Sequence, residues 1–245
     1  MREKSVLILG ASSGIGRAVA SEYAANGFDL MLTTRNPEVL TGLKSHLQIE
    51  HKCQVQIEAL DISDPLEPVD FSDLLERLPL GIISCIGDLS DEEACSSDTK
   101  ALSTNFRING EGPIIFLEYF ANRFSDRGFG FVVAISSVAG DRGRATNGFY
   151  GSAKAMLSTY LSALRNRMFD RNVFVMDVRP GFVKTSMTAH LDLPNLLTTD
   201  PVFVARDIFK GQQSRKDILY TPYYWSWIMF IIRNIPEFCF KRMKI

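Results

Sequence analysis

Cysteine and histidine are scarce in this sequence, and its charges nearly cancel. The 245 residues include three histidines and four cysteines, which are Cys53, Cys85, Cys95 and Cys239. No two of these cysteines have Cys-x-x-Cys spacing, so we expect no zinc site and no disulfide framework, as is typical of a reducing cytoplasm. A formal net charge of −1, with no dense basic run, gives no reason to expect nucleic acid as a partner.

Long hydrophobic runs are also missing. No uninterrupted apolar stretch approaches the ~20 residues that a membrane-spanning helix needs. The apolar run at residues 6–9 leads directly into a glycine, so we expect a strand there and not a signal peptide. The chain is nevertheless 46% hydrophobic, which suffices for the core of one substantial domain.

Short apolar runs alternate with helix-forming runs along the chain. The predicted strands cover residues 5–9, 29–34, 54–60, 80–86, 129–135, 172–178 and 217–221. The predicted helices cover residues 17–25, 39–49, 71–78, 98–123, 149–167 and 201–211. This alternation predicts a single α/β domain of Rossmann type, with a doubly wound parallel sheet of about seven strands and helices on both faces.

Two stretches interrupt the regular pattern. Inside the predicted helix 98–123, the run Asn109-Gly-Glu-Gly-Pro113 is unfavourable for a straight helix and predicts a kink or a widened turn. Residues 187–200 have no clear periodicity, and we expect mostly loop that forms a mobile lid over a substrate.

Glycines cluster where the first predicted strand ends. The run Gly10-Ala-Ser-Ser-Gly14-Ile-Gly16 separates that strand from a helix-forming run. Free backbone N–H groups and the helix dipole attract phosphate at such a junction, although an ordinary glycine turn is the alternative. We therefore predict a dinucleotide site. Its first contacts are Gly10, Ser12, Ser13, Gly14, Ile15 and Gly16.

Arg35 follows the second predicted strand directly. An acidic residue at this point of a dinucleotide fold binds the adenosine ribose, whereas a basic residue accommodates the 2′-phosphate of NADP. Arg35 therefore favours NADP(H), with a solvated surface arginine as the alternative, and NAD(H) stays open as the cofactor.

Tyr150 and Lys154 are the candidate catalytic pair. Their spacing of four residues in a helix-forming run places both side chains on one helical face. A phenol titrates near ~10, so it needs a nearby cation such as Lys154 to become more acidic. Ser137, thirteen residues before Tyr150, follows a predicted strand and could hold a substrate oxygen that Tyr150 protonates.

Together, this serine and the Tyr-x-x-x-Lys motif resemble the catalytic set of the short-chain dehydrogenase/reductases, whose glycine spacing the first turn also resembles. The resemblance implies hydride transfer between NAD(P)(H) and a ketone or secondary alcohol, without a metal. In these roles Ser137 binds the carbonyl and Tyr150 donates the proton. Lys154 lowers the pKa of Tyr150 and binds the nicotinamide ribose. Homodimers or homotetramers are usual in the family.

The same resemblance implies further site residues. Asn109 would hold a water that relays protons to the lysine, with Asn105 as the competing candidate. Asp61 and Ile62 would contact the adenine edge, although a plain turn is nearly as good an explanation of Asp61. Gly87 would let the backbone approach the cofactor, but Ser84-Cys85-Ile86 departs from the asparagines usual before it. The loop after the sixth strand would line the nicotinamide through Pro180, Gly181, Val183 and Thr185.

Residues 222–245 form an aromatic and basic extension beyond the predicted nucleotide-binding domain of residues 1–221. Three interpretations stay open: a subunit interface, a wall of the substrate pocket, or a peripheral membrane contact in which aromatic residues lie beside Lys241, Arg242 and Lys244. This stretch, with Phe149-Tyr150-Gly151-Ser152 and residues 186–191, resembles the reductases of decaprenylphosphoryl-ribose 2′-epimerase systems. That resemblance implies a lipid-linked keto-sugar as substrate, and Arg35 departs from its pattern.

Two alternatives accompany this prediction. Within the enzyme class, a reductase of fatty-acyl or small ketone substrates is the second candidate. In a different class, the chain would be a non-catalytic protein that senses NADP(H). Such sensors commonly lose the tyrosine or the lysine, and both residues are present here.

Overall fold

The computed structural model describes residues 4–64, 71, 77–89 and 91–243. Its main sheet has seven parallel strands in the order β3-β2-β1-β4-β5-β6-β9. The strands are β1 (Ser5–Leu9), β2 (Asp29–Thr34), β3 (Val55–Ala59), β4 (Gly81–Ser84), β5 (Gly130–Ile135), β6 (Val173–Pro180) and β9 (Ile218–Thr221). The predicted doubly wound sheet is confirmed, while most of the helix expected over residues 71–78 lies outside the described residues.

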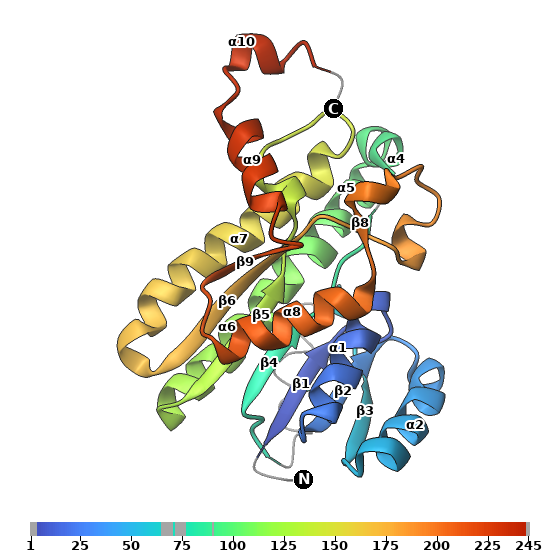
Figure 1. Ribbon diagram of the computed structural model, residues 1–245, viewed down its shortest axis with the longest axis vertical. Helices are drawn as coiled ribbons and strands as arrows, with labels where there is room; N and C mark the ends of the chain where they lie inside the picture. The colour runs from blue at the N-terminus through green and yellow to red at the C-terminus, as the bar shows by residue number, and fades with distance from the viewer. Residues whose placement is uncertain (1–3, 65–70, 72–76, 90, 244–245) are drawn as a thin grey trace.

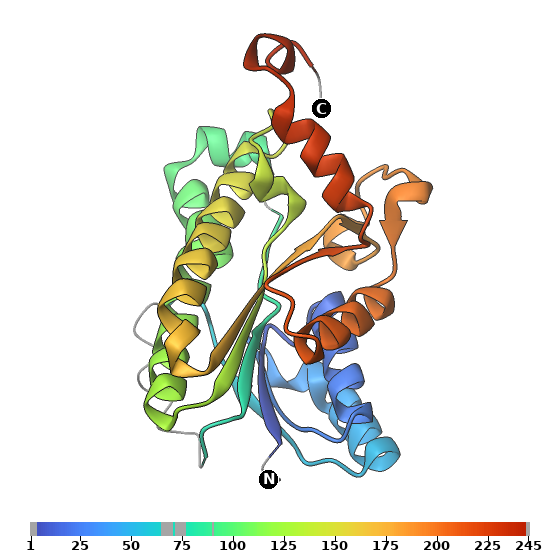
Figure 2. The ribbon, with the colours of Figure 1, turned by 60° about the vertical axis from the view of Figure 1, so that its left-hand side comes forward.

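Helices cover both faces of this sheet, as Figures 1 and 2 show. One face carries α1 (Gly14–Ala25), α2 (Thr41–His51) and α8 (Pro201–Gln213). The other carries α6 (Gly112–Arg127) and α7 (Gly148–Met168). Successive residues of a strand point to opposite faces, so Val6 and Ile8 join the first core, and Leu7 and Leu9 join the second. A strand buried on both faces must be apolar throughout, which explains the continuous run in β1.

The widened turn predicted at Asn109 is confirmed. The short α4 (Glu92–Ser97) leads into α5 (Thr99–Phe106), which runs into a π-helical turn at Arg107–Glu111, and α6 continues from Gly112. A Cβ at Gly112 would lie 2.3 Å from the carbonyl oxygen of Ile62, so the chain passes too close for any other residue. The loop after β3 therefore packs against the start of α6, directly after the π-helical turn.

The last part of the chain contains structure that the sequence pattern did not predict. β7 (Phe182–Val183) pairs with β8 (Thr198–Thr199), so a strand near the end of the expected lid, residues 187–200, pairs with the chain just before the lid. Beyond β9 the chain forms α9 (Trp225–Asn234) and α10 (Glu237–Phe240). Both helices project at the end of the molecule opposite the N-terminus (Figures 1 and 2). Within the described part of the chain, no helix combines the length and hydrophobicity that a bilayer crossing requires.

Candidate active site

A cavity of about 750 Å³ opens at the carboxyl ends of β1, β4, β5 and β6. Open parallel sheets bind ligands at this edge, because the loops that leave the strands diverge there. Most of the predicted site residues line the cavity: Gly10, Ser12, Ser13, Gly14, Ile15, Arg35, Asp61, Ile62, Gly87, Ser137, Tyr150, Lys154, Pro180, Gly181, Val183 and Thr185. Gly16 and Asn109 lie behind this lining.

The glycine turn of residues 10–16 brings backbone atoms into close contact. Gly10 has φ +71, a conformation that glycine adopts without a steric cost. A Cβ at Gly16 would lie 2.4 Å from the carbonyl oxygen of Gly10. Ser13 caps α1, because its Oγ accepts a hydrogen bond from the Gly16 N–H at 3.0 Å. The turn thus presents bare backbone and a helix N-terminus to the cavity, which fits the pyrophosphate of a dinucleotide.

Ser137 and Tyr150 both line the cavity. Ser137 follows β5, and its Oγ accepts a hydrogen bond from the Ala139 N–H at 3.1 Å. Burial raises the pKa of Tyr150 to about 12, with a further increase from the charge of Asp88, while a hydrogen bond with Ser137 opposes the shift. The sequence-based prediction that Lys154 lowers this pKa is therefore not met, because burial is the largest cause and the net shift is upward. The phenol is therefore protonated at neutral pH.

Lys154 lies beneath this pair and is buried. Its Nζ donates hydrogen bonds to the carbonyl oxygens of Ile86 at 3.0 Å and Ile135 at 3.1 Å, and it lies 5.8 Å from the centroid of the Tyr150 ring. Burial lowers the pKa of Lys154 to about 8, and the negative charge of Asp177 partly offsets that shift. The lysine therefore stays mainly cationic at pH 7 and ties the ends of β4 and β5 together.

Asn109 fixes the turn that follows β4. Its Oδ1 accepts a hydrogen bond from the Asp88 N–H at 2.9 Å, and its Nδ2 donates to the carbonyl oxygens of Asp88 at 2.8 Å and Asn105 at 3.2 Å. Asn105 is equally buried, yet its amide atoms have no hydrogen-bond partner among the described residues. A Cβ at Gly87 would lie 3.2 Å from Lys154 Nζ and 3.5 Å from Asn109 Oδ1. The absence of a side chain at Gly87 therefore leaves room for both side chains to pack against the turn after β4. A water relay through Asn109 stays a prediction.

Arg35 and Asp61 lie at one rim of the cavity. Arg35 is exposed, and its charge contributes to lowering the pKa of Asp61. The larger cause of that shift is Ser63, whose N–H and Oγ donate to Asp61 Oδ1 at 2.9 and 2.7 Å. Arg17, by contrast, donates from Nη2 to the carbonyl oxygen of Val39 at 2.7 Å. Arg35 is therefore the better placed of the two arginines to meet an anionic group in the cavity.

The loop after β6 is packed between the glycine turn and the C-terminal segment. A Cβ at Gly14 would lie 2.9 Å from Thr185 Cγ2, and a Cβ at Gly181 would lie 1.8 Å from Trp225 Nε1. The rings of Phe182 and Trp225 make an edge-to-face contact at 5.2 Å. α9 therefore supports the cavity wall from behind, while the residues that line the cavity belong to other elements.

Sequence reasoning missed a polar network that supports Ser137. Asp177 accepts a hydrogen bond from Ser136 Oγ at 2.5 Å and pairs with Arg179 at 2.8 Å. Arg179 also pairs with Asp141 at 2.7 Å, and the Tyr220 hydroxyl donates to that aspartate at 2.8 Å. The only hint in the sequence was Arg179 in front of Pro-Gly, because the partners lie far apart along the chain.

Comparison with known proteins gives the same result as the geometry. The family model for short chain dehydrogenases matches residues 4–195, so the chain belongs to this family. An uncharacterized oxidoreductase of Mycobacterium tuberculosis is 29% identical over 241 residues, covering 97% of this chain and 96% of its own length. Mouse dehydrogenase/reductase SDR family member 7B is 25% identical over 268 residues, covering 99% of this chain and 81% of its own length.

Solved structures show the same fold at lower sequence identity. A short-chain dehydrogenase from Sphingobium yanoikuyae, in complex with NADPH, has a TM-score of 0.83 at 22% identity, covering 96% of this chain and 97% of that one. The bulky-bulky ketone specific alcohol dehydrogenase from Comamonas testosteroni has a TM-score of 0.81 at 21% identity, covering 96% and 95%. The protein is thus an oxidoreductase of the short-chain dehydrogenase family, of the nicotinamide-dependent type that acts on CH–OH groups.

Proposed function

We propose that this protein reduces a ketone to a secondary alcohol with NADPH, reversibly, and that the ketone is a lipid-linked keto-sugar. One observation carries the reaction: Ser137, Tyr150 and the buried Lys154 line the same cavity, and Lys154 Nζ lies 5.8 Å from the centroid of the Tyr150 ring. A nicotinamide bound in the cavity would supply or accept the hydride.

The chain's own residues would hold the carbonyl and supply the proton. Ser137 Oγ donates a hydrogen bond to the substrate oxygen and so orients it toward Tyr150. The Tyr150 hydroxyl then transfers its proton to that oxygen as negative charge develops there. Lys154 is mainly cationic at neutral pH because its pKa is about 8, so it stabilises the phenolate that remains.

The pKa of Tyr150 supports the reductive direction at neutral pH. A phenol with a pKa of about 12 carries its proton at pH 7 and acts as an acid. Oxidation of the alcohol needs the phenolate as a base, and that form becomes common only at alkaline pH. We therefore expect the ratio of oxidation to reduction rates to rise with pH.

Arg35 supports NADP(H) over NAD(H). Its exposed guanidinium lies at the cavity rim, beside the turn that carries Asp61, where it could pair with a 2′-phosphate. We expect Arg35→Ala to raise the KM for NADPH by at least about tenfold and to leave the KM for NADH nearly constant, because it removes one charge-assisted contact. Arg17→Ala is the matched control. An equal effect on both cofactors would contradict this assignment.

Two features support a keto-sugar as the substrate: the polar residues that line the cavity and the resemblance of the C-terminal segment. Asp88, Ser186 and Thr188 line the cavity and could bind sugar hydroxyls. In addition, residues 222–245 resemble reductases that act on polyprenyl-linked sugars. We further propose a cytoplasmic homodimer or homotetramer, with residues 1–221 as its nucleotide-binding domain and the remaining residues as an extension that contacts the membrane.

Turnover with defined ketones tests the reaction. We expect oxidation of NADPH with a panel that contains a keto-pentose, an aliphatic ketone and a 3-ketoacyl thioester, with the highest kcat/KM for the keto-pentose. Preference for the thioester would replace the sugar with a fatty-acyl substrate. Binding of NADPH without oxidation for every ketone would instead indicate a cofactor-sensing protein. Light scattering of the purified chain measures the subunit number.

A further inference from the structure

The helix α9 has apolar side chains on opposite sides. Trp225 and Met229 point inward and are 3% and 0% exposed. Tyr223, Trp227, Phe230 and Ile231 recur at helical spacing on the outer side and are 75%, 67%, 62% and 64% exposed. A helix that is apolar all round is normally covered on all sides. The outer side therefore requires a partner.

The charges of this C-terminal segment are mainly positive. Residues 222–245 contain four basic residues and one acidic residue, although the whole chain has a net charge of −1. The acidic residue, Glu237, pairs with Arg142 at 2.9 Å. Arg233, Lys241 and Arg242 are exposed. An anionic surface complements this combination of aromatic and basic side chains.

The inner side of α9 joins this surface to the cavity wall. Trp225 and Met229 pack on Val138, the residue after Ser137, and Leu197 of the lid packs against the same cluster. Arg142 holds the far end of the helix, because its Nη1 donates to the carbonyl oxygens of Ile232 and Ile235, each at 2.6 Å. The expected lid, residues 187–200, and α9 lie at the same end of the molecule (Figure 2).

We propose that residues 223–243 form a docking surface for an anionic lipid bilayer. A helix of ten residues is too short to span a bilayer, but it can lie in the interface with Trp227, Phe230 and Ile231 among the acyl chains. A second copy of the chain is the competing occupant of this surface, and the test below distinguishes it from a bilayer. The proposal rests on the proposed function insofar as a docked enzyme presents its cavity to a lipid-linked substrate.

Vesicle flotation of the full chain tests the docking surface without turnover. The probes are vesicles of phosphatidylcholine alone and of phosphatidylcholine with about one third phosphatidylglycerol. We expect binding to the anionic vesicles, at least about tenfold weaker binding to the neutral ones, and weaker binding in high salt. Trp227 should show a blue-shifted emission and quenching by spin-labelled lipid.

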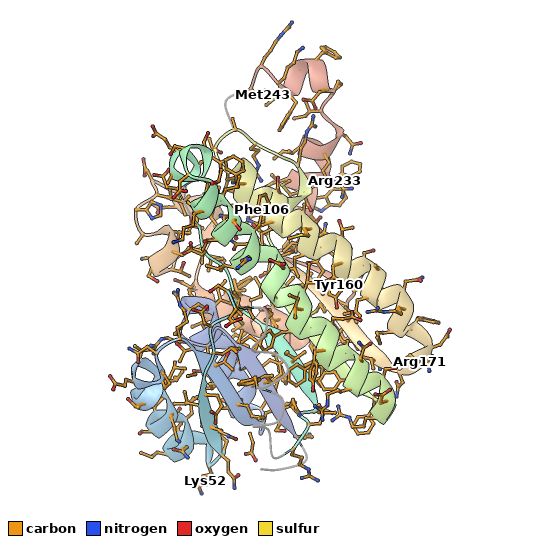
Figure 3. The ribbon with its side chains drawn as sticks, turned by 180° about the vertical axis from the view of Figure 1, so that it is seen from behind. Lys52, Phe106, Tyr160, Arg171, Arg233 and Met243 are labelled. Carbon is orange, nitrogen blue, oxygen red and sulfur yellow. The ribbon has the colours of Figure 1, made fainter. Side chains whose placement is uncertain are left out.

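Matched variants locate the surface. The double variant Trp227→Ser/Phe230→Ser should weaken binding to anionic vesicles at least about tenfold, because two aromatic anchors are lost. Lys241→Gln/Arg242→Gln should reduce the difference between the two vesicle types. The control Ile49→Ser/Phe169→Ser removes two apolar residues that are more exposed, at 80% and 83%. Lys52, three residues after Ile49, and Arg171, two residues after Phe169, both lie far from Arg233 and Met243 (Figure 3). This control should bind like the unmodified chain.

Three results would overturn the proposal: no flotation with anionic vesicles, equal loss in the control variant, or a dimer without vesicle binding that Trp227→Ser/Phe230→Ser dissociates. The last result would assign the surface to a second copy of the chain. Thermal unfolding checks that each variant is folded, and the lipid-quenching measurement on the unmodified chain needs no variant. Turnover of a water-soluble ketone, measured without vesicles, separates failure of the reaction from failure of the docking surface.

Discussion

The two walls of the cavity are held in different ways. The inner wall, at the end of β4, is fixed by buried groups: Asn109 binds both backbone groups of Asp88, and Lys154 binds the Ile86 carbonyl. The outer wall includes Ser137, and it is backed by the turn Val138–Asp141. It is supported from outside by α9 and by Arg142, which lies near the surface.

The catalytic residues and the exposed C-terminal segment therefore belong to different parts of the molecule. The groups with strongly shifted pKa values at the site, Tyr150 and Lys154, lie in the body of the domain, where burial is the main cause of both shifts. The outer wall depends on a segment that exposes much of its apolar surface. Variants of the inner wall should therefore change catalysis and stability, whereas loss of Arg142 should mainly loosen the C-terminal segment.

Removing the phenol of Tyr150 should have the largest effect. We expect Tyr150→Phe to lower the rate of ketone reduction by ~10²–10⁴-fold, because the positioned acid is lost, while NADPH still binds. Tyr160→Phe is the matched control on the same helix, since its hydroxyl bonds Glu118 at 2.9 Å away from the cavity. Steady-state kinetics and a cofactor titration measure both quantities. Turnover by Tyr150→Phe within about tenfold of the unmodified rate would assign the acid elsewhere.

Substitutions of two buried asparagines on neighbouring helical turns test how the inner wall is held. Asn109→Ala should lower the free energy of unfolding by about 2–4 kcal/mol, because three hydrogen bonds are lost and two backbone groups of Asp88 lose their partner. Asn105→Ala should change it by less than about 1 kcal/mol, because the amide of Asn105 has no partner among the described residues. Denaturant titration measures both, and equal losses would show that the Asn109 clamp does not hold the inner wall.

The pH dependence of the reduction rate should follow the titration of Lys154 in the inner wall. The pKa of Lys154 is lowered to about 8, so the rate should fall about tenfold between pH 7 and pH 9 as the cation is lost. Tyr150 keeps its proton over this range. A free lysine titrates at 10.5, so the unfolded chain holds this proton longer, and the contribution of Lys154 to stability rises between pH 8 and 10.5. A rate that stays constant to pH 10 would contradict the role of the cation.

Loss of Arg142 should affect global stability less than loss of Asn109. Arg142→Met removes the bonds to the carbonyl oxygens of Ile232 and Ile235 and the ion pair with Glu237, and we expect a cost of about 1–2 kcal/mol. Trypsin should then cut more rapidly at Arg233 and Lys241. Arg123→Met removes an exposed arginine of α6 and is the control. If cleavage in the two variants is equally fast, Arg142 does not anchor the segment.

Several features of the site followed from local spacing. The glycine turn, the four-residue step from Tyr150 to Lys154 and the widened turn at Asn109 each depend on residues close in the sequence, so chain geometry places them. The upward pKa shift of Tyr150 did not follow, because burial depends on everything that packs around the ring. The network from Ser136 to Tyr220 was missed for a similar reason, since its partners come from β6, β9 and the turn after Ser137.

The sequence by itself determined the order of strands and helices, the cofactor-binding edge and the residues that could transfer a proton, because periodicity and spacing act over one or two helical turns. Only the tertiary structure decided that burial raises the pKa of Tyr150, and that Asn109 rather than Asn105 holds the end of β4. It also decided that α9 packs on Val138 and leaves Trp227 exposed. These outcomes depend on which distant segments meet, and that choice is made by the packing of the whole chain.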